Sequence, residues 1–246
     1  MPQGEERPVS IVFPRWTNAV PGVLVATLGV LGLGVVWATW YYATPDFWQV
    51  GYEPDQPVAF SHQIHAGQLG IDCRHCHSNV EQSGHSNIPD TATCMSCHTG
   101  AGEAGYLNAS LWAVHRGNSD LVRIRAAYAS GEPIRWRRIH KIPDYAHFNH
   151  AIHVNAGISC YSCHGRMDQQ EIARQVHSLS MGWCLDCHRS PEEHVVDVND
   201  PNIRRITNLA AVEKQLANRP AQLATGVELV IQNKLQPPQH CGACHY

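Results

Sequence analysis

All ten cysteines of this 246-residue chain occur in one repeated pattern, C-x-x-C-H. Two thiols three positions apart can reach the two vinyl groups on one edge of a porphyrin, and the histidine that follows lies under its iron. The pattern therefore predicts five covalently attached haem c groups, each held by two thioethers and one proximal imidazole. The predicted attachment residues are Cys73, Cys76, Cys94, Cys97, Cys160, Cys163, Cys184, Cys187, Cys241 and Cys244, and the proximal iron ligands are His77, His98, His164, His188 and His245.

Paired cysteines also hold zinc, and cysteines of exported chains form disulfides. Neither use requires a histidine directly after the second cysteine, yet all five pairs have one. The pattern thus favours haem attachment, which also predicts a location outside the cytoplasm. Charged residues make up 16% of the chain and the formal net charge is -3, a balance that does not point to nucleic acid as a partner.

An apolar segment near the N-terminus predicts a transmembrane helix. Residues 16–45 contain no charged side chain, and about 20 apolar residues cross a bilayer as a helix. A signal peptide would have a shorter apolar region and a small-residue cleavage site, whereas this run ends in aromatic residues that suit the membrane interface. We predict an N-terminal segment over 1–16, a transmembrane helix in contact with lipid over 17–42, and a haem domain over 43–246.

The basic residues on either side of this helix predict its orientation. Arg7 and Arg15 precede it, and no Lys or Arg follows until Arg74. The positive-inside rule then leaves the N-terminus in the cytoplasm and the haem domain in the periplasm, as a single-pass protein of the bacterial inner membrane.

One face of the predicted helix has small side chains, at Gly22, Ala26 and Gly29. Small residues at this spacing let membrane helices approach closely, although glycine is also common in membrane helices generally. The face favours packing against helices of partner subunits.

The segments before the haem motifs contain an internal repeat. Phe60-Ser-His62-Gln-Ile-His65 precedes the first motif, and Phe148-Asn-His150-Ala-Ile-His153 precedes the third. Histidines three positions apart on a helical turn face the same side, so such a pair can bind two different irons and hold two haems close together. The repeat predicts two di-haem modules, over 60–98 and 148–188, and a single C-terminal haem over 236–246.

Five proximal ligands leave twelve of the seventeen histidines for other roles. The repeat selects His62, His65, His150 and His153 as distal iron ligands. For the fifth haem, His140 is the first candidate, and His85 and Met181 are the alternatives. A thioether ligand at Met181 would raise the potential of its haem relative to bis-histidine ligation, but this side chain also suits simple packing against a haem.

The segment between the modules, 99–147, is predicted to contain a helix near 108–130 and a basic stretch. Its basic residues are Arg116, Arg123, Arg125, Arg135, Arg137, Arg138 and Lys141. They form either a solvated face or guanidinium partners for buried haem propionates. Further on, 206–235 is predicted to form two helices broken at Arg219-Pro220.

Tandem F-x-H-x-x-H and C-x-x-C-H motifs resemble those of class III cytochromes of the c3 and c7 type. The resemblance implies a mostly α-helical, loop-rich multihaem fold built from di-haem modules, after the transmembrane helix. It also implies that the first histidine of each turn serves the haem whose motif follows, so that His62 pairs with His77 and His150 with His164. The second histidine reaches a different haem, which the resemblance leaves open for His65 and His153.

The anchor together with FSHQIHAGQLGIDCRHCH, IPDTATCMSCH, FNHAIHVNAGISCYSCHG and LSMGWCLDCHR is similar to the pentahaem membrane-anchored cytochrome c subunit of alternative complex III. That resemblance implies an electron-transfer subunit without catalytic residues of its own, in a quinol-oxidising respiratory or photosynthetic complex. The implied partners are an iron–sulfur protein, quinol-binding membrane subunits, and a cytochrome c, copper protein or oxidase as acceptor. Two other functions stay open: a stand-alone membrane-anchored multihaem quinol dehydrogenase, and a multihaem reductase enzyme.

Overall fold

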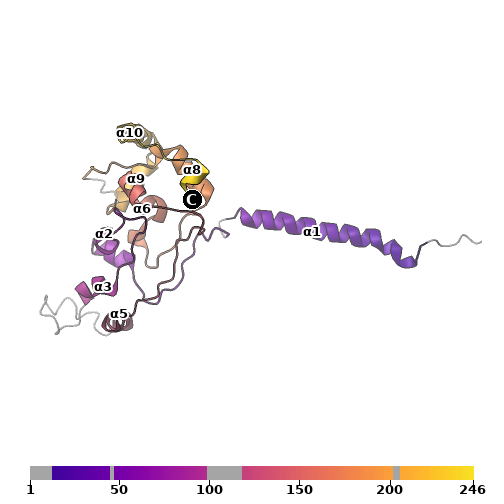
Figure 1. Cartoon of the computed structure of the whole chain (residues 1–246), viewed down its shortest axis with the longest axis horizontal. Coiled ribbons are helices and arrows are strands. Elements are labelled where there is room, and N and C mark those ends of the chain that lie inside the picture. The colour runs from indigo at the N-terminus through magenta and orange to yellow at the C-terminus, as the bar shows by residue number, and fades with distance from the viewer. Residues whose placement is uncertain (1–12, 45–46, 99–117, 202–205) are drawn as a thin grey trace, which may run out of the picture. The chain divides into compact units, whose positions relative to one another are not determined.

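The computed structural model describes residues 13–44, 47–98, 118–201 and 206–246. The chain divides into two compact units, Met1–Phe47 and Trp48–Tyr246. Among the described residues the only β-structure is an isolated bridge between Ile158 and Val195, so the fold consists of helices and loops (Figure 1).

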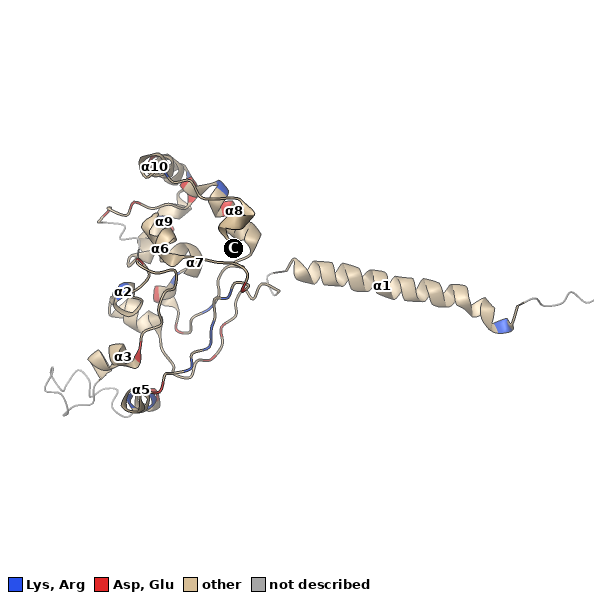
Figure 2. Cartoon of the chain, viewed as in Figure 1, with Lys and Arg blue, Asp and Glu red and all other residues tan. Residues whose placement is uncertain are grey.

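The first unit is a single apolar helix. A 3-10 turn, η1 (Arg15–Ala19), leads into α1 (Val20–Tyr42), with a proline in the first turn where no backbone donor is lost. No charged residue interrupts α1 in Figure 2, and by length and composition this helix could span a membrane. At its end Tyr41 stacks on Trp37 at 5.6 Å between ring centroids, which forms an aromatic cluster of the kind found at membrane interfaces.

Short helices joined by long loops build the second unit, and all five C-x-x-C-H motifs lie on such helices or begin there. The elements are η2 (Gln63–Gln68), α2 (Cys73–Cys76), α3 (Thr91–His98), α5 (Ser119–Ser130), α6 (His150–Asn155), α7 (Cys160–His164), η4 (Met167–Gln169), α8 (Met181–Arg189), η5 (Pro191–Glu193), α9 (Leu209–Ala217), α10 (Arg219–Gln232) and η6 (Cys241–Ala243). Capping side chains start three of the motif helices: Asp72, Ser159 and Ser180 each accept a hydrogen bond from a backbone N–H of the first turn.

The helices expected on either side of the second module agree with the structure where it is described. α5 falls inside the predicted range 108–130, while residues 108–117 and Arg116 lie outside the described residues. α9 ends at Ala217 and α10 begins at Arg219, with Pro220 in its first turn, so the break occurs where the sequence predicts it.

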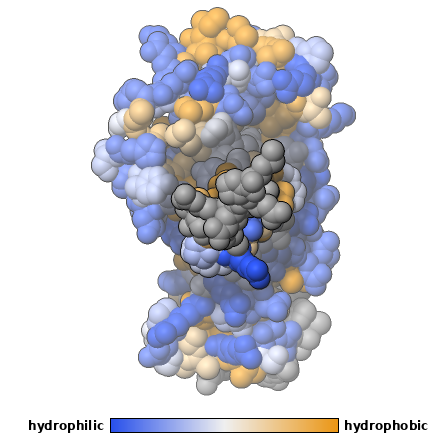
Figure 3. Space-filling model, turned by 90° about the vertical axis from the view of Figure 1, so that its right-hand side faces the viewer, coloured by the Kyte–Doolittle hydropathy of each residue, from blue (hydrophilic) through white to orange (hydrophobic). Residues whose placement is uncertain are grey.

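The apolar core is divided into small clusters that hold particular helices. Val58, Leu121 and Ile124 form one cluster, and the partly buried Cys94 and Trp136 pack against it, so α5 supports the second haem motif. Around α10, Gly226 lies so close to the Glu192 carbonyl that a side chain there would collide with it. The outer surface in Figure 3 is mostly hydrophilic, with an apolar area at the end of the domain where α10 lies.

Candidate haem-binding sites

The two F-x-H-x-x-H segments adopt the same side-chain geometry although one is a π-helical turn and the other an α-helix. In the first, the Phe60 ring stacks on His65 at 4.5 Å and meets His62 edge-on at 4.9 Å. In the second, Phe148 stacks on His153 at 4.4 Å and meets His150 edge-on at 4.8 Å. The phenylalanine therefore orients both histidines of its turn.

Most of the predicted iron ligands form a hydrogen bond between Nδ1 and a backbone carbonyl. The Nδ1 atoms of the second histidine of each turn lie 2.8 Å from the carbonyls of Ser61 and Asn149. Proximal Nδ1 atoms bond likewise to carbonyls: His77 to Asn87 at 2.6 Å, His188 to Pro238 at 2.6 Å, and His245 to Tyr145 at 2.9 Å. An imidazole that donates from Nδ1 to a carbonyl keeps its Nε2 lone pair free for a metal.

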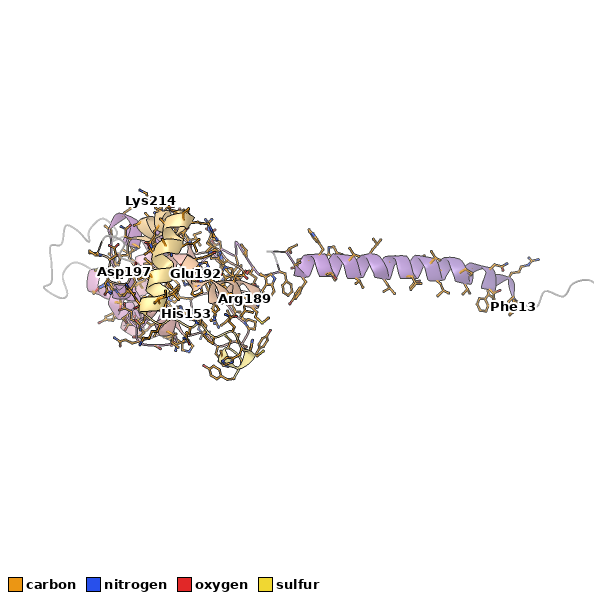
Figure 4. The ribbon with its side chains drawn as sticks, turned by 90° about the horizontal axis from the view of Figure 1, so that it is seen from above. Phe13, His153, Arg189, Glu192, Asp197 and Lys214 are labelled. Carbon is orange, nitrogen blue, oxygen red and sulfur yellow. The ribbon has the colours of Figure 1, made fainter. Side chains whose placement is uncertain are left out.

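Two pairs of rings have the separation expected for axial ligands of one iron. The ring centroids of His65 and His98 are 6.1 Å apart, and those of His153 and His188 are 6.0 Å apart. Figure 4 labels His153 and Arg189, the residue that follows His188 in the sequence. An imidazole nitrogen binds a metal at about 2.0–2.1 Å, so two rings on opposite sides of one metal have centroids roughly 6 Å apart. These side chains therefore fit haem iron, and the geometry offers partners for His65 and His153.

A group of partly buried histidines surrounds the first and third sites. Burial lowers the pKa of His62 to about 4 and that of His140 to about 4, with smaller contributions from neighbouring histidines. Burial also lowers the pKa of His164 well below its usual value, and next in importance are the charges of His140 and His150. Burial thus favours the neutral imidazole, which is the form that binds a metal.

His140 has an unusual position beside a proximal ligand. Its Nε2 lies 3.1 Å from Nδ1 of His164, and the two ring centroids are 4.2 Å apart. This is a direct contact of the two rings, and it involves Nδ1, the nitrogen that His77, His188 and His245 turn to a carbonyl. Nδ1 of His62 is buried and has no hydrogen-bond partner among the described residues. Whether His140, His85 or Met181 is the fifth distal ligand stays a prediction; His85 is exposed, and Met181 is 68% exposed.

Several of the cysteine sulfurs lie in surroundings that favour a neutral group. Burial raises the pKa of Cys73 and of Cys163 to about 12, and that of Cys187 to about 11, with neighbouring thiols adding to each effect. A thioether sulfur carries no charge and does not titrate, so the same burial accommodates haem attachment without a desolvation cost.

The geometry does not support the two other uses of paired cysteines. Zinc needs three or four protein ligands in one place. In the part of the chain that the structure describes, no group of three or more His, Cys, Asp and Glu side chains is placed to hold a metal ion. All ten cysteines are described, and each is a free thiol in the structure. Two imidazoles suit the iron of a porphyrin, and two separate thiols suit its vinyl groups.

The C-terminal motif includes a residue that spacing alone does not select. The His147 backbone N–H donates to the Cys244 carbonyl at 2.8 Å, and its ring stacks on Tyr246 at 4.4 Å. His147 therefore belongs to the fifth site, about 100 residues away in the sequence from the motif it contacts. No local signal indicates this contact, because it depends on docking of two distant loops.

Three of the basic residues bond to backbone carbonyls near the sites. Arg123 donates to Pro57 at 2.6 Å, Arg125 to His98 at 3.3 Å, and Arg138 to His140 at 3.2 Å. Arg135, Arg137 and Lys141 are exposed. Pairing of these residues with propionates stays a prediction.

Two kinds of known protein are similar to this chain. Residues 44–123 match the model of the class III cytochrome c family. The chain is also similar to the menaquinone reductase multiheme cytochrome c subunit of Nitratidesulfovibrio vulgaris, with 28% identity over 196 residues that cover 70% of this chain and 84% of that protein.

The helices, the loops and the matched segment define a class III cytochrome c domain, which follows one apolar helix that could span a membrane. More particularly, the chain is a multihaem electron-transport cytochrome c. Class III cytochromes bind haem c covalently, and ten cysteines in this spacing indicate several haems.

Proposed function

We propose that this chain is the electron-transfer subunit of a membrane complex that exchanges electrons with quinones, and that it carries five haem c groups. The observation that carries the proposal is the pair of 6.0–6.1 Å ring separations, which join each F-x-H-x-x-H turn to the second motif of its own module. Haem c supplies reversible one-electron exchange when it is bound. The chain's own residues hold each porphyrin edge, orient two imidazoles towards its iron, and keep neighbouring sites close.

Within this proposal, His65 pairs with His98 and His153 with His188. His62 and His150 are the distal ligands of the first and third haems, and the distal ligand of the fifth is one of His140, His85 and Met181. When both axial positions are occupied, small molecules have no free coordination site, so the chain is expected to have no catalytic site of its own.

The proposed setting is a complex like alternative complex III. Quinol-binding membrane subunits and an iron–sulfur protein would deliver electrons, and a cytochrome c, copper protein or oxidase would accept them. α1 would anchor the chain in the inner membrane with its N-terminus in the cytoplasm and the haem domain in the periplasm. Two features support this orientation. Basic residues precede α1, and the C-x-x-C-H motifs after it predict covalent haem attachment, which takes place outside the cytoplasm.

The name of the relative favours a second candidate, in which electrons move in the opposite direction. That relative is a subunit of a menaquinone reductase. A chain in such a complex would receive electrons from a periplasmic donor and pass them towards menaquinone. The haem sites are the same in both candidates, and only the partners differ.

One experiment tests the function and its direction. The intact complex is purified from membranes, and the haem absorbance is followed after addition of a menaquinol analogue or, separately, of a reduced periplasmic cytochrome c. Fast haem reduction by the quinol supports quinol oxidation, whereas fast reduction by the cytochrome followed by quinone-dependent reoxidation supports menaquinone reduction. Saturable reduction of nitrite by the purified chain alone would refute both and assign it to the reductases.

A further inference from the structure

We propose that the five haem attachment sites form one unbranched series in the spatial order second, first, third, fourth, fifth. Sites are numbered by the order of their motifs in the sequence, from Cys73 to Cys244. The inference rests on the proposed multihaem function and adds the spatial order of the sites, which determines where partners can exchange electrons.

The first and second sites are neighbours within the first module. The ring of His65, on the turn before the first motif, lies 6.1 Å from that of His98 in the second motif.

The first site, and not the second, joins the two modules. The loop over 83–87 accepts hydrogen bonds from both sides: Asn87 from Nδ1 of His77 at 2.6 Å, and Gly84 from Nδ1 of His150 at 3.0 Å. The sequence order of the first two sites is therefore reversed in space.

The third and fourth sites are held together by backbone contacts and by the second turn. Val196 donates to the Gly157 carbonyl at 2.9 Å, which ties the segment after the fourth motif to the segment before the third. The ring of His153, on the turn before the third motif, lies 6.0 Å from that of His188 in the fourth motif.

The fifth site continues from the fourth. Nδ1 of His188 donates to the Pro238 carbonyl at 2.6 Å, and the Gln239 side chain donates to the His188 carbonyl at 3.3 Å. The loop that leads into the fifth motif is therefore docked on the fourth.

In this series the second and fifth sites each have one neighbouring site, whereas the others have two. The fifth site is also open to the surroundings, since Cys241 and His245 are exposed and Tyr246 is 85% exposed. Exchange with partner proteins is therefore expected at the two ends, with the fifth site as an accessible docking end for a redox partner.

Two matched ligand variants of the full haem-loaded chain test the order. His65→Met changes a distal ligand at the second site, and His153→Met changes one at the fourth. Each altered site loses an imidazole and titrates at a higher potential than before. Its earlier reduction adds a negative charge that lowers the potential of the adjacent sites, because Coulomb interactions weaken with distance.

The readout is a redox titration followed by haem absorbance and electron paramagnetic resonance. We expect His65→Met to shift the potential of one other haem and His153→Met to shift two. Ile64→Met and Ile152→Met, on the same turns at exposed positions, should shift none.

Two neighbours shifted by His65→Met, or only one by His153→Met, would overturn the order. A density map of the haem-loaded complex, with each porphyrin traced to its own motif, gives the order independently of the variants. A covalent haem count below five would overturn the proposed five-haem chain itself, whereas five haems in another order would overturn only this inference.

Discussion

Gln222 offers a direct test of how the helices after the fourth motif hold the haem domain together. Its side chain is 2% exposed, and its Nε2 donates to the carbonyls of Glu192 at 3.0 Å and Val195 at 2.8 Å. Its Oε1 accepts from Gln215 at 2.9 Å. Through these bonds α10 fixes the segment after His188.

The Gln222→Ala change removes three hydrogen bonds and leaves the buried Val195 carbonyl without this donor. A net loss of about 1 kcal/mol per bond gives roughly 3 kcal/mol of destabilisation. For a domain of this size, about 2–4 °C of melting temperature is lost per kcal/mol, so Tm should fall by roughly 6–12 °C.

The assay is thermal melting of the purified haem-loaded chain, followed by circular dichroism at 222 nm and by haem absorbance. Gln232→Ala is the matched control, because that side chain bonds only Glu228 on the same exposed helix face, among the contacts described, at 2.9 Å. The control should change the free energy of unfolding by less than about 0.5 kcal/mol. A Gln222→Ala variant that melts within about 2 °C of the unmodified chain would show that α10 does not stabilise this region.

Three further predictions concern the ligands, the anchor and pH. His65→Ala and His153→Ala should each convert about one haem in five to a high-spin form, and an unchanged electron paramagnetic resonance spectrum in both would refute the pairing. A Gly22→Leu, Gly29→Leu double variant should still insert and carry haem but co-purify poorly with its membrane partners, because leucine at these small positions would prevent close approach of a partner helix; undiminished co-purification would show a passive tether. Burial lowers the pKa of His177, which stacks on Trp183 at 5.2 Å, so the unfolded chain binds this proton more readily and stability should fall as pH drops below about 6.5. His177→Gln should reduce that pH dependence in melting experiments between pH 7 and 5, and an identical dependence would contradict the assignment.

Local spacing determines much of this protein. C-x-x-C-H predicts the attachment cysteines and the proximal histidines, because two thiols and an imidazole within five residues can reach one porphyrin. The apolar helix follows from length and absence of charge, and the break before α10 follows from Pro220. The F-x-H-x-x-H repeat likewise predicts two equivalent turns, because Phe60 and Phe148 reach both histidines of their own turn.

Tertiary structure decides which of these local units meet. The sequence leaves the partners of His65 and His153 open, and the fold brings His98 and His188 to about 6 Å from them across loops. The same holds for His147 at the fifth motif. Such contacts form between loops and backbone carbonyls that are far apart in the chain. No local sequence pattern predicts which of these segments will meet. The sequence thus predicts the type of each site, whereas the packing of the loops decides which sites are neighbours.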